Sequence, residues 1–341
     1  MNQTWLDQLT STGSKPETNG SEQASLPEDS VQFIGRGDLA VIRFSGDDAG
    51  TFLQSQTCND HNAVSANTAQ LDGYCSPKGR LLALPTVIAD DTGDTFYWLL
   101  AKDLVAPVVK RLTMFVLRSD VTITVQEDWV VVGLAAKSDQ LNASLEPWFG
   151  DSETEVMASW TVNSHRVIKA PGGSGVSRSL LFGPVDALKQ SLSACIEVLP
   201  DHASEPLWSA SSSWALGDIK AGIPSIVAKT QDAFVPQMVN LEQVGGLSFT
   251  KGCYPGQEIV ARMQYLGKLK RAMVRFSSEE SSVAQPGDKL AAGDDENAGE
   301  VVNSVATGNG MECLAVIKTS ADPSAFTLNG GALNAEELPY T

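Results

Sequence analysis

The first half of the chain presents its apolar segments in an order that few folds accommodate. Alternation typical of strands covers residues 39–44, 80–88, 95–100, 121–125 and 129–134. Helical spacing starts at Asp47 or Asp48 and returns over residues 103–120. The resulting order of strand, helix, strand, strand, helix and strand is that of the split βαβ unit. We therefore expect an α+β fold.

The second of these helices carries an apolar stripe that we expect to face the core. Pro107 falls near its first turn, where proline is tolerated because the missing N–H has no helical partner there. The stripe consists of Leu104, Val105, Val108, Val109, Leu112, Phe115 and Val116.

The pattern of apolar residues changes near residue 267. Before it, residues 184–196 and 205–222 have helical spacing, and residues 223–246 are mostly loop. After it, short alternating runs separated by Gly/Asp turns predict a small antiparallel β-barrel. We expect a flexible polar tail at residues 1–30, an α+β region at 31–267 and the barrel at 268–341.

Charge and composition exclude several kinds of function. The formal net charge is −17, which disfavours non-specific nucleic-acid binding, because such binding needs many contacts between cationic side chains and phosphates. Five cysteines without a C-x-x-C pair argue against a disulfide framework, and with only three histidines we expect no protein-held metal. The sequence shows neither an apolar stretch long enough to span a membrane nor an export signal. We expect a cytoplasmic protein.

The stretch "KGCYPGQE", residues 251–258, carries the strongest chemical signal. Pro255 suits the first position of a helix, which would place Cys253 and Tyr254 at its positively polarised end. Together with Lys251 two residues earlier, that end would favour a thiolate over a thiol. The plain alternative is that Cys253 is an inert packing residue.

Cations gather around this stretch in an otherwise acidic chain. Residues 251–271 hold five cations against one acid, Glu258. Such a cluster beside a glycine-rich turn predicts an anion site, although helix-end lysines also serve only solubility. The cations are Lys251, Arg262, Lys268, Lys270 and Arg271.

The same stretch resembles the signature of the YgfZ family, which is related to the glycine-cleavage T-protein. Similarity extends to "FSGDDAGTFLQSQTCND", "YCSPKGRLLA", the long run from "AGIPSIVAK" through "KGCYPGQEIVAR", and the terminal "LPYT". The resemblance covers residues 38–341. It implies a three-part ring in which two interleaved ferredoxin-like subdomains and the small barrel surround a central folate channel.

The resemblance also implies how folate is held. Trp214 is the counterpart of a folate-contacting tryptophan, and stacking of a flat pterin on an indole fits that role. Two positions depart from the family pattern: Leu39 replaces a second such tryptophan, and Lys220 stands where relatives often have an acid. The remaining residues that we assign to folate binding are Gln237, Asn240, Tyr254, Gln257, Glu258 and Arg262.

Three functions follow from the resemblance. The first is a folate-binding accessory protein of iron–sulfur metabolism that supports iron–sulfur enzymes, including those that modify tRNA, with Cys253 and Lys251 as its reactive residues. The second is a glycine-cleavage aminomethyltransferase, which the absence of a carboxylate from "KGRLLALPT" disfavours. The third is a non-catalytic binding module. We expect a monomer whose partners are a tetrahydrofolate derivative and iron–sulfur proteins; whether it turns over a substrate stays open.

Overall fold

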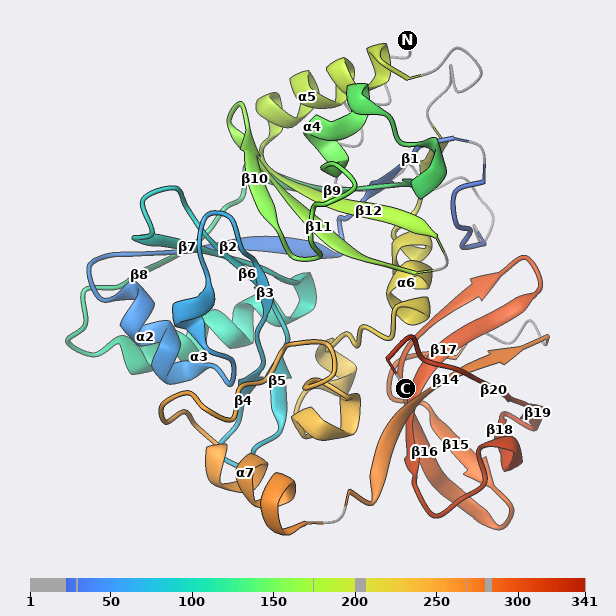
Figure 1. Ribbon diagram of the computed structural model, residues 1–341. Coiled ribbons are helices and arrows are strands. Elements are labelled where there is room, and N and C mark those ends of the chain that lie inside the picture. The colour runs from blue at the N-terminus through green and yellow to red at the C-terminus, as the bar shows by residue number, and fades with distance from the viewer. Residues whose placement is uncertain are drawn as a thin grey trace.

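The computed structural model describes residues 23–28, 30–173, 175–199, 207–267, 269–279 and 284–340. Three large antiparallel or mixed sheets and their covering helices make up an α+β protein (Figure 1). The expected fold class is therefore confirmed. In the described residues, no helix has the length and apolar character needed to cross a membrane.

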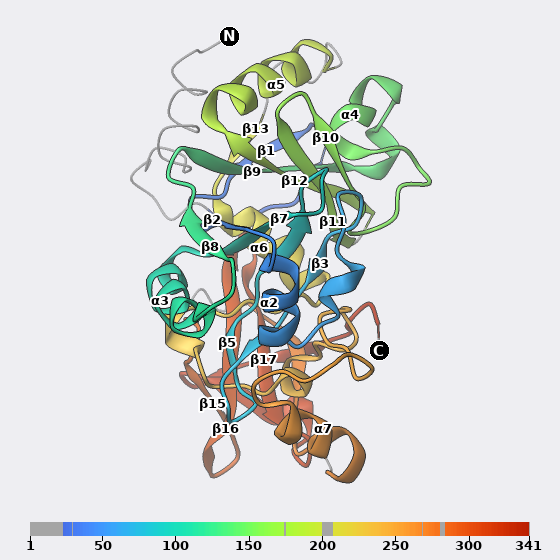
Figure 2. The same ribbon diagram turned by 90° about the vertical axis from the view of Figure 1, so that its left-hand side faces the viewer.

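The first sheet has the strand order β3-β6-β7-β2-β8. Without its edge strand β3, this is the ferredoxin-like order, in which the first and third strands lie in the middle. Helices α2 and α3 lie on the same face of the sheet (Figure 2) and pack on it through Phe44, Leu53 and Leu112. The bounds are β2 Leu39–Ser45, α2 Ala49–Gln56, β3 Gln70–Leu71, β6 Thr86–Ala89, β7 Thr95–Ala101, α3 Val105–Val116 and β8 Thr122–Val125.

The structure corrects three details of this region. The run 80–88 is two strands, because Pro85 interrupts it: β5 (Leu81–Ala83) pairs with β4 (Tyr74–Cys75), and β6 belongs to the first sheet. The run 129–134 lies in the second sheet, so the ferredoxin-like unit ends with β8. Phe115 lies at the outer edge of the helical stripe and is 41% exposed, whereas Val108 is buried.

The second sheet has the order β10-β11-β12-β9-β1-β13. Its strand β1 comes from the N-terminal side of the whole first sheet, so the two α+β units are interleaved, as expected. Helices α4 and α5 cover its outer face (Figure 1). The bounds are β1 Gln32–Gly35, β9 Trp129–Lys137, α4 Glu146–Phe149, β10 Ser159–Val162, β11 His165–Gly173, β12 Val176–Pro184, α5 Val185–Glu197 and β13 Leu207–Ser209.

Residues 205–222 are not one helix. Leu207–Ser209 forms β13, which pairs in parallel with β1, and only Ser211–Lys220 forms the helix α6. Helix α6 stands between the second sheet and the C-terminal sheet (Figure 1). Its residues Leu216 and Ile219 pack in the apolar core that also contains Phe44 and Leu112. Trp214 packs between the first and second sheets.

The C-terminal sheet has the order β19-β18-β15-β16-β17-β14-β20. Its end strands β19 and β20 are separated in sequence only by Leu333, so the sheet curls into a nearly closed barrel around Phe276, Val301 and Phe326. The bounds are β14 Arg271–Ser278, β15 Lys289–Ala292, β16 Asp295–Thr307, β17 Gly310–Lys318, β18 Phe326–Leu328, β19 Gly331–Ala332 and β20 Asn334–Glu336. Before it, helix α7 spans Gln257–Leu266.

The expected polar tail falls largely outside the described residues. Its last part, residues 23–28, is packed on the body of the protein. Ala24 is buried, donates its N–H to the carbonyl of Ala306 at 2.8 Å and forms a parallel bridge with Thr307. The expectation of a flexible tail is therefore wrong for residues 23–28. Their polar composition does not indicate that the main chain pairs with β16.

A partly buried carboxylate joins the barrel to α6. Glu312 on β17 contacts Lys220 at 2.7 Å through one oxygen and Arg275 at 2.8 Å through the other. Burial alone would raise the pKa of Glu312, but hydrogen bonds from Arg275 and Lys220 lower it overall. Lys220 thus faces the barrel, which accounts for a cation at this position of α6.

Replacement of Glu312 by Gln should destabilise the protein by about 1–3 kcal/mol at neutral pH, because two cations lose their partner. Since the folded pKa lies below the unfolded one, the stabilisation is present above pH ~4.5 and lost as the pH falls through the folded value. Thermal unfolding between pH 7 and pH 3 measures how the stabilisation by Glu312 depends on pH. The melting temperatures of Glu312→Gln and wild type should converge toward acid; a constant difference would contradict this role.

Candidate folate pocket and the Cys253 segment

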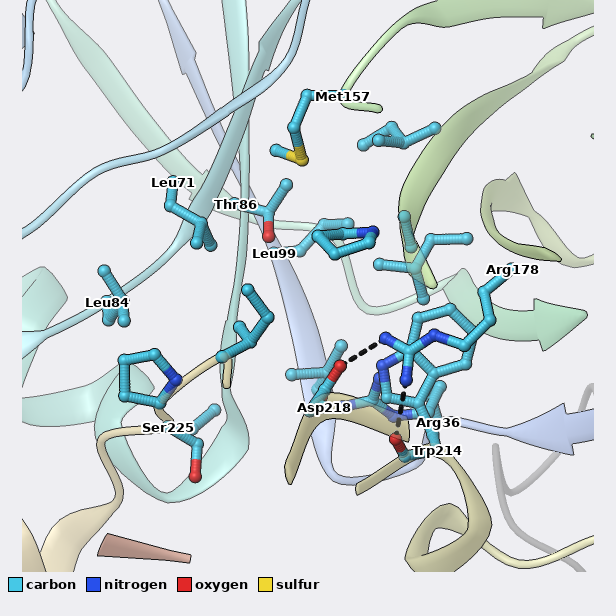
Figure 3. A pocket seen from close by; sticks show the side chains of 18 of the residues that line it. Arg36, Leu71, Leu84, Thr86, Leu99, Met157, Arg178, Trp214, Asp218 and Ser225 are labelled. Atoms are coloured by element: carbon cyan, nitrogen blue, oxygen red, sulfur yellow. Dashed lines mark hydrogen bonds and ion pairs between the residues drawn. The ribbon is translucent and has the colours of Figure 1, made fainter. Parts of the chain in front are cut away.

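A pocket opens in the apolar layer between the first and second sheets. Its volume is about 110 Å³. Apolar side chains form most of its wall, among them Leu99 of the first sheet and Leu180 of the second. Arg36, Arg178, Trp214 and Asp218 gather at one end (Figure 3). The pocket thus has an apolar part and a charged end; we call it the interlayer pocket.

A buried guanidinium organises the charged end. Arg178 on β12 forms an ion pair with Asp218 and donates Nη1 to the carbonyl oxygen of Trp214 at 3.0 Å (Figure 3). A β-carbon at Gly217 would come within 1.9 Å of Arg178 Nη1, so only glycine allows this approach. Arg178 Nε is buried and has no hydrogen-bond partner among the described residues.

Asp218 presents a carboxylate to the pocket. Its side chain keeps 22% of its surface exposed, whereas that of Arg178 keeps 2%. The carboxylate therefore retains accepting capacity on the pocket side while its charge is balanced by Arg178. Burial lowers the pKa of Arg178 and the charge of Asp218 raises it, but a guanidinium stays protonated at neutral pH in either case.

Trp214 lies in the pocket wall but offers little free ring surface. It is 2% exposed, and the guanidinium carbon of Arg178 lies 4.1 Å from its ring centroid. That of Arg36, which is held by Asp38 at 2.7 Å, lies 5.2 Å from the same ring. The open indole face expected for pterin stacking is therefore not present in this conformation, because cations occupy it.

The structure brings together only some of the residues expected to bind folate. Leu39, at the start of β2, lines the interlayer pocket together with Trp214. Gln237 donates to the carbonyl of Val260 at 2.7 Å, and Asn240 donates to that of Met273 at 3.1 Å, so both connect neighbouring segments. None of the six other expected residues lines this pocket: Gln237, Asn240, Tyr254, Gln257, Glu258 and Arg262.

The Cys253 segment differs from the expected helix cap. Helix α7 begins at Gln257, and its N-cap is Gly256, with a φ of 86°. A β-carbon on Gly256 would lie 2.4 Å from the carbonyl oxygen of Ser76 and 2.7 Å from Cα of Gly79. The motif thus turns tightly against the β4–β5 turn, and Cys253 and Pro255 lie before the cap, outside the helix. The Cys253 side chain is exposed.

Lys251 faces the interior and not the solvent side of the motif. It is 8% exposed, and its Nζ donates to the carbonyls of Gln54 and Thr57 at 2.6 Å each. These carbonyls lie at the C-terminal end of α2, where a cation is favoured by the helix dipole. Burial lowers the pKa of Lys251, and the nearby Asp72 opposes this. Lys251 therefore anchors the motif to α2, which corrects its assignment as a charge that activates Cys253.

Tyr254 also contacts the ammonium group of Lys251. It is buried, its ring centroid lies 5.3 Å from Lys251 Nζ, and burial raises its pKa well above the ordinary value. Cys58 and Cys75 are buried as well, and burial raises the pKa of Cys58. Within the described ranges, no three His, Cys, Asp or Glu side chains are placed to hold a metal ion.

Sequence reasoning missed the charged groups of the interlayer pocket. Trp214 and Asp218 are four residues apart, so helical spacing alone puts them on one face of α6. This spacing indicates that Asp218 lies beside Trp214. Arg178 stands in the apolar run "GVSRSLLFGP", and a charge inside a buried strand points to an internal partner. For Arg36 we find no comparable signal.

Comparison with known proteins was made with both the sequence and the fold. No protein-family model matches the chain. It is 30% identical to the tRNA-modifying protein YgfZ of Klebsiella pneumoniae over 336 residues, which covers 96% of this chain and 97% of that protein. It is 32% identical to YgfZ of Hamiltonella defensa over 274 residues, covering 79% and 77%. To YgfZ of Colwellia psychrerythraea it is 27% identical, covering 93% and 95%.

The fold is similar to that of the glycine cleavage system aminomethyltransferase T from Bartonella henselae. The TM-score is 0.69 at 12% sequence identity, and the match covers 98% of this chain and 96% of that one. At this identity the similarity establishes a shared fold and not a shared activity.

Lys251→Met should destabilise the protein by about 1–3 kcal/mol, because the change leaves two carbonyls at the end of α2 without their donor. Urea unfolding measures the loss. Lys229→Met, at an exposed position, is the matched control and should change the free energy of unfolding by less than about 0.5 kcal/mol. Equal stability of the two variants would show that Lys251 is not an anchor.

Proposed function

Since the chain belongs to the YgfZ family, we propose that it binds a reduced folate in the interlayer pocket and supports iron–sulfur enzymes, including those that modify tRNA. The family relatives carry the name tRNA-modifying protein. In this proposal the protein acts in the cytoplasm, and folate binding and the thiol of Cys253 are separate parts of its function.

The observation that carries the proposal is the composition of the interlayer pocket. Its apolar walls, which include Leu39, Leu99 and Leu180, suit the faces of a flat pterin. At the charged end, Asp218 can accept from the amino and ring N–H groups of a pterin, and the unpartnered Nε of Arg178 can donate to an acceptor. When bound, a reduced folate would supply a one-carbon unit.

In this proposal Trp214 has a positioning role. Its carbonyl and its ring both hold the Arg178 guanidinium, and that guanidinium in turn orients Asp218. The indole would contribute stacking only after the Arg178 guanidinium shifts. Because Leu39 lies in the same wall, the side where relatives have a second tryptophan would contact the ligand through aliphatic carbons.

The aminomethyltransferase alternative receives less support from the pocket. Among its lining residues, Asp218 is the one carboxylate, and it is already paired with Arg178. The segment from β5 to β6 contributes Leu84 and Thr86 to the pocket wall, and neither can stabilise a developing positive charge as a carboxylate would.

Cys253 supplies the thiol chemistry of the proposal. It is the exposed cysteine among the five, whereas the other four are buried. An accessible thiol can act as a nucleophile or as one ligand of a transiently held cluster, which would need further ligands from a partner. The non-catalytic binding module remains the competing interpretation, because exposure alone does not establish reactivity.

Folate titration followed by indole fluorescence tests the pocket. Asp218→Asn should weaken binding by about 1.5–3 kcal/mol, since a charge-assisted acceptor is lost. Trp214→Ala should weaken it by about 1–3 kcal/mol; calorimetry is used for this variant because it lacks the reporting indole. Asp186→Asn, an exposed carboxylate on α5, should bind like wild type. Equal affinities for all four proteins would place folate elsewhere or nowhere.

A deletion strain complemented with cysteine variants tests the thiol. Cys253→Ala and Cys253→Ser should abolish support of an iron–sulfur tRNA-modifying enzyme, because no other exposed cysteine can replace the sulfur. Stability and folate affinity should change by less than about 1 kcal/mol, as for most surface changes. If the Ser variant complements fully, Cys253 is a structural residue and the binding module is the better description.

A further inference from the structure

A second pocket, of about 310 Å³, lies between the α+β body and the barrel. Arg80, Ala233, Phe234 and Met238 line it from the body. From the barrel it is lined by Arg271 on β14, Lys289 on β15, Asn297 and Glu300 on β16, and Val316 on β17. We call it the barrel pocket; it is separate from the interlayer pocket, with which it shares no lining residue.

The charge of the barrel pocket is opposite to that of the protein. Three cations line it against one carboxylate, Glu300, in a chain with a formal net charge of −17. Arg80 is far in the sequence from Arg271 and Lys289, so local sequence composition does not explain their convergence.

The two arginines are held by backbone carbonyls and not by carboxylates. Arg80 donates Nη1 to the carbonyl oxygen of Ala233, with that of Asp232 at 3.5 Å. Arg271 donates Nη2 to the carbonyl oxygen of Asn297 at 3.2 Å. These contacts fix each guanidinium at one end, and its other N–H groups can bind a ligand.

The acids around the pocket are engaged elsewhere. Glu300 contacts Lys289 at 2.6 Å and neutralises that cation. A hydrogen bond from Lys318, with a smaller contribution from the charge of Arg271, lowers the pKa of Asp295. Asp295 is thus bound by Lys318 and does not line the pocket. Among the described residues, neither Arg80 on the body nor Arg271 on the barrel forms an ion pair with a carboxylate, and both line the same space.

We propose that the barrel pocket is a binding site for a small ligand that carries two or more oxyanion groups, either phosphates or carboxylates. Guanidinium forks match both groups in geometry. A bound oxyanion would relieve the repulsion between Arg80 and Arg271 and would link the barrel to the body. The proposal does not depend on folate binding in the interlayer pocket.

Isothermal titration calorimetry with pyrophosphate and, separately, with γ-linked triglutamate tests the site and distinguishes the two sources of the anion. Binding of at least one of them should saturate at one equivalent per chain. It should also weaken when NaCl is raised from 50 to 500 mM, because part of the attraction is screened. Stabilisation by ligand should appear as a rise in melting temperature.

Three variants make the result decisive. Arg80→Gln/Arg271→Gln should lose tenfold or more in affinity, roughly one charge-assisted contact or more. Glu300→Gln removes the single acid from the pocket and should bind about threefold tighter or better. Arg118→Gln, an exposed arginine on the loop after α3, controls for net charge and should bind like wild type.

The higher anion affinity expected for Glu300→Gln keeps the proposal testable even if the double arginine variant does not fold. Absence of saturable binding of both anions to wild type would overturn the proposal. So would equal losses for Arg118→Gln and the double variant, because binding would then be a general effect of surface charge. Tighter binding of pyrophosphate would assign the site to phosphates, and tighter binding of triglutamate to carboxylates.

Discussion

The arrangement between the two sheets depends on one buried guanidinium. Arg178 projects from β12 into an apolar layer, where an unpaired charge would be strongly unfavourable. Asp218, the carbonyl of Trp214 and the indole ring together compensate it, and all three belong to α6. This requirement fixes the helix against the second sheet, excludes a side chain at position 217 and directs a carboxylate toward the pocket. The pocket chemistry is thus a consequence of how a core charge is satisfied.

The parts of the fold that follow from local periodicity could be predicted from the sequence. Strands β2 and β7 and helices α3 and α5 lie close to the ranges that alternation and helical spacing indicate, and the short strands of the barrel follow residue 267 as expected. The assignment of strands was wrong where pairing with a distant segment determines the local structure. Pro85 divides one apolar run between two sheets, and Leu207–Ser209 is a strand because β1 offers an unpaired edge. Neither partner can be inferred from the residues themselves.

The site was predicted less well, because its contacts join residues far apart in the sequence. Lys251 was assigned to Cys253 by proximity in sequence, but its ammonium group binds carbonyls of Gln54 and Thr57. Likewise, Gly256 is needed for close packing against Ser76 and Gly79, which lie about 180 residues earlier in the chain. Trp214 and Leu39, the two positions that the family resemblance singled out, line the same pocket. It could not reveal that cations cover the indole.

The interleaving of the two α+β units has a consequence for how the chain reaches its native state. Gln32 in β1 pairs with Ala135 on one side and with Leu207 on the other. During synthesis, the second sheet cannot close until β13 has left the ribosome, although the ferredoxin-like unit formed by β2 to β8 is complete long before. Until then the apolar strand β1 can pair only with β9, and its other edge has no partner in the native register. Such non-local pairing slows folding and leaves a hydrophobic edge open to wrong partners during the wait.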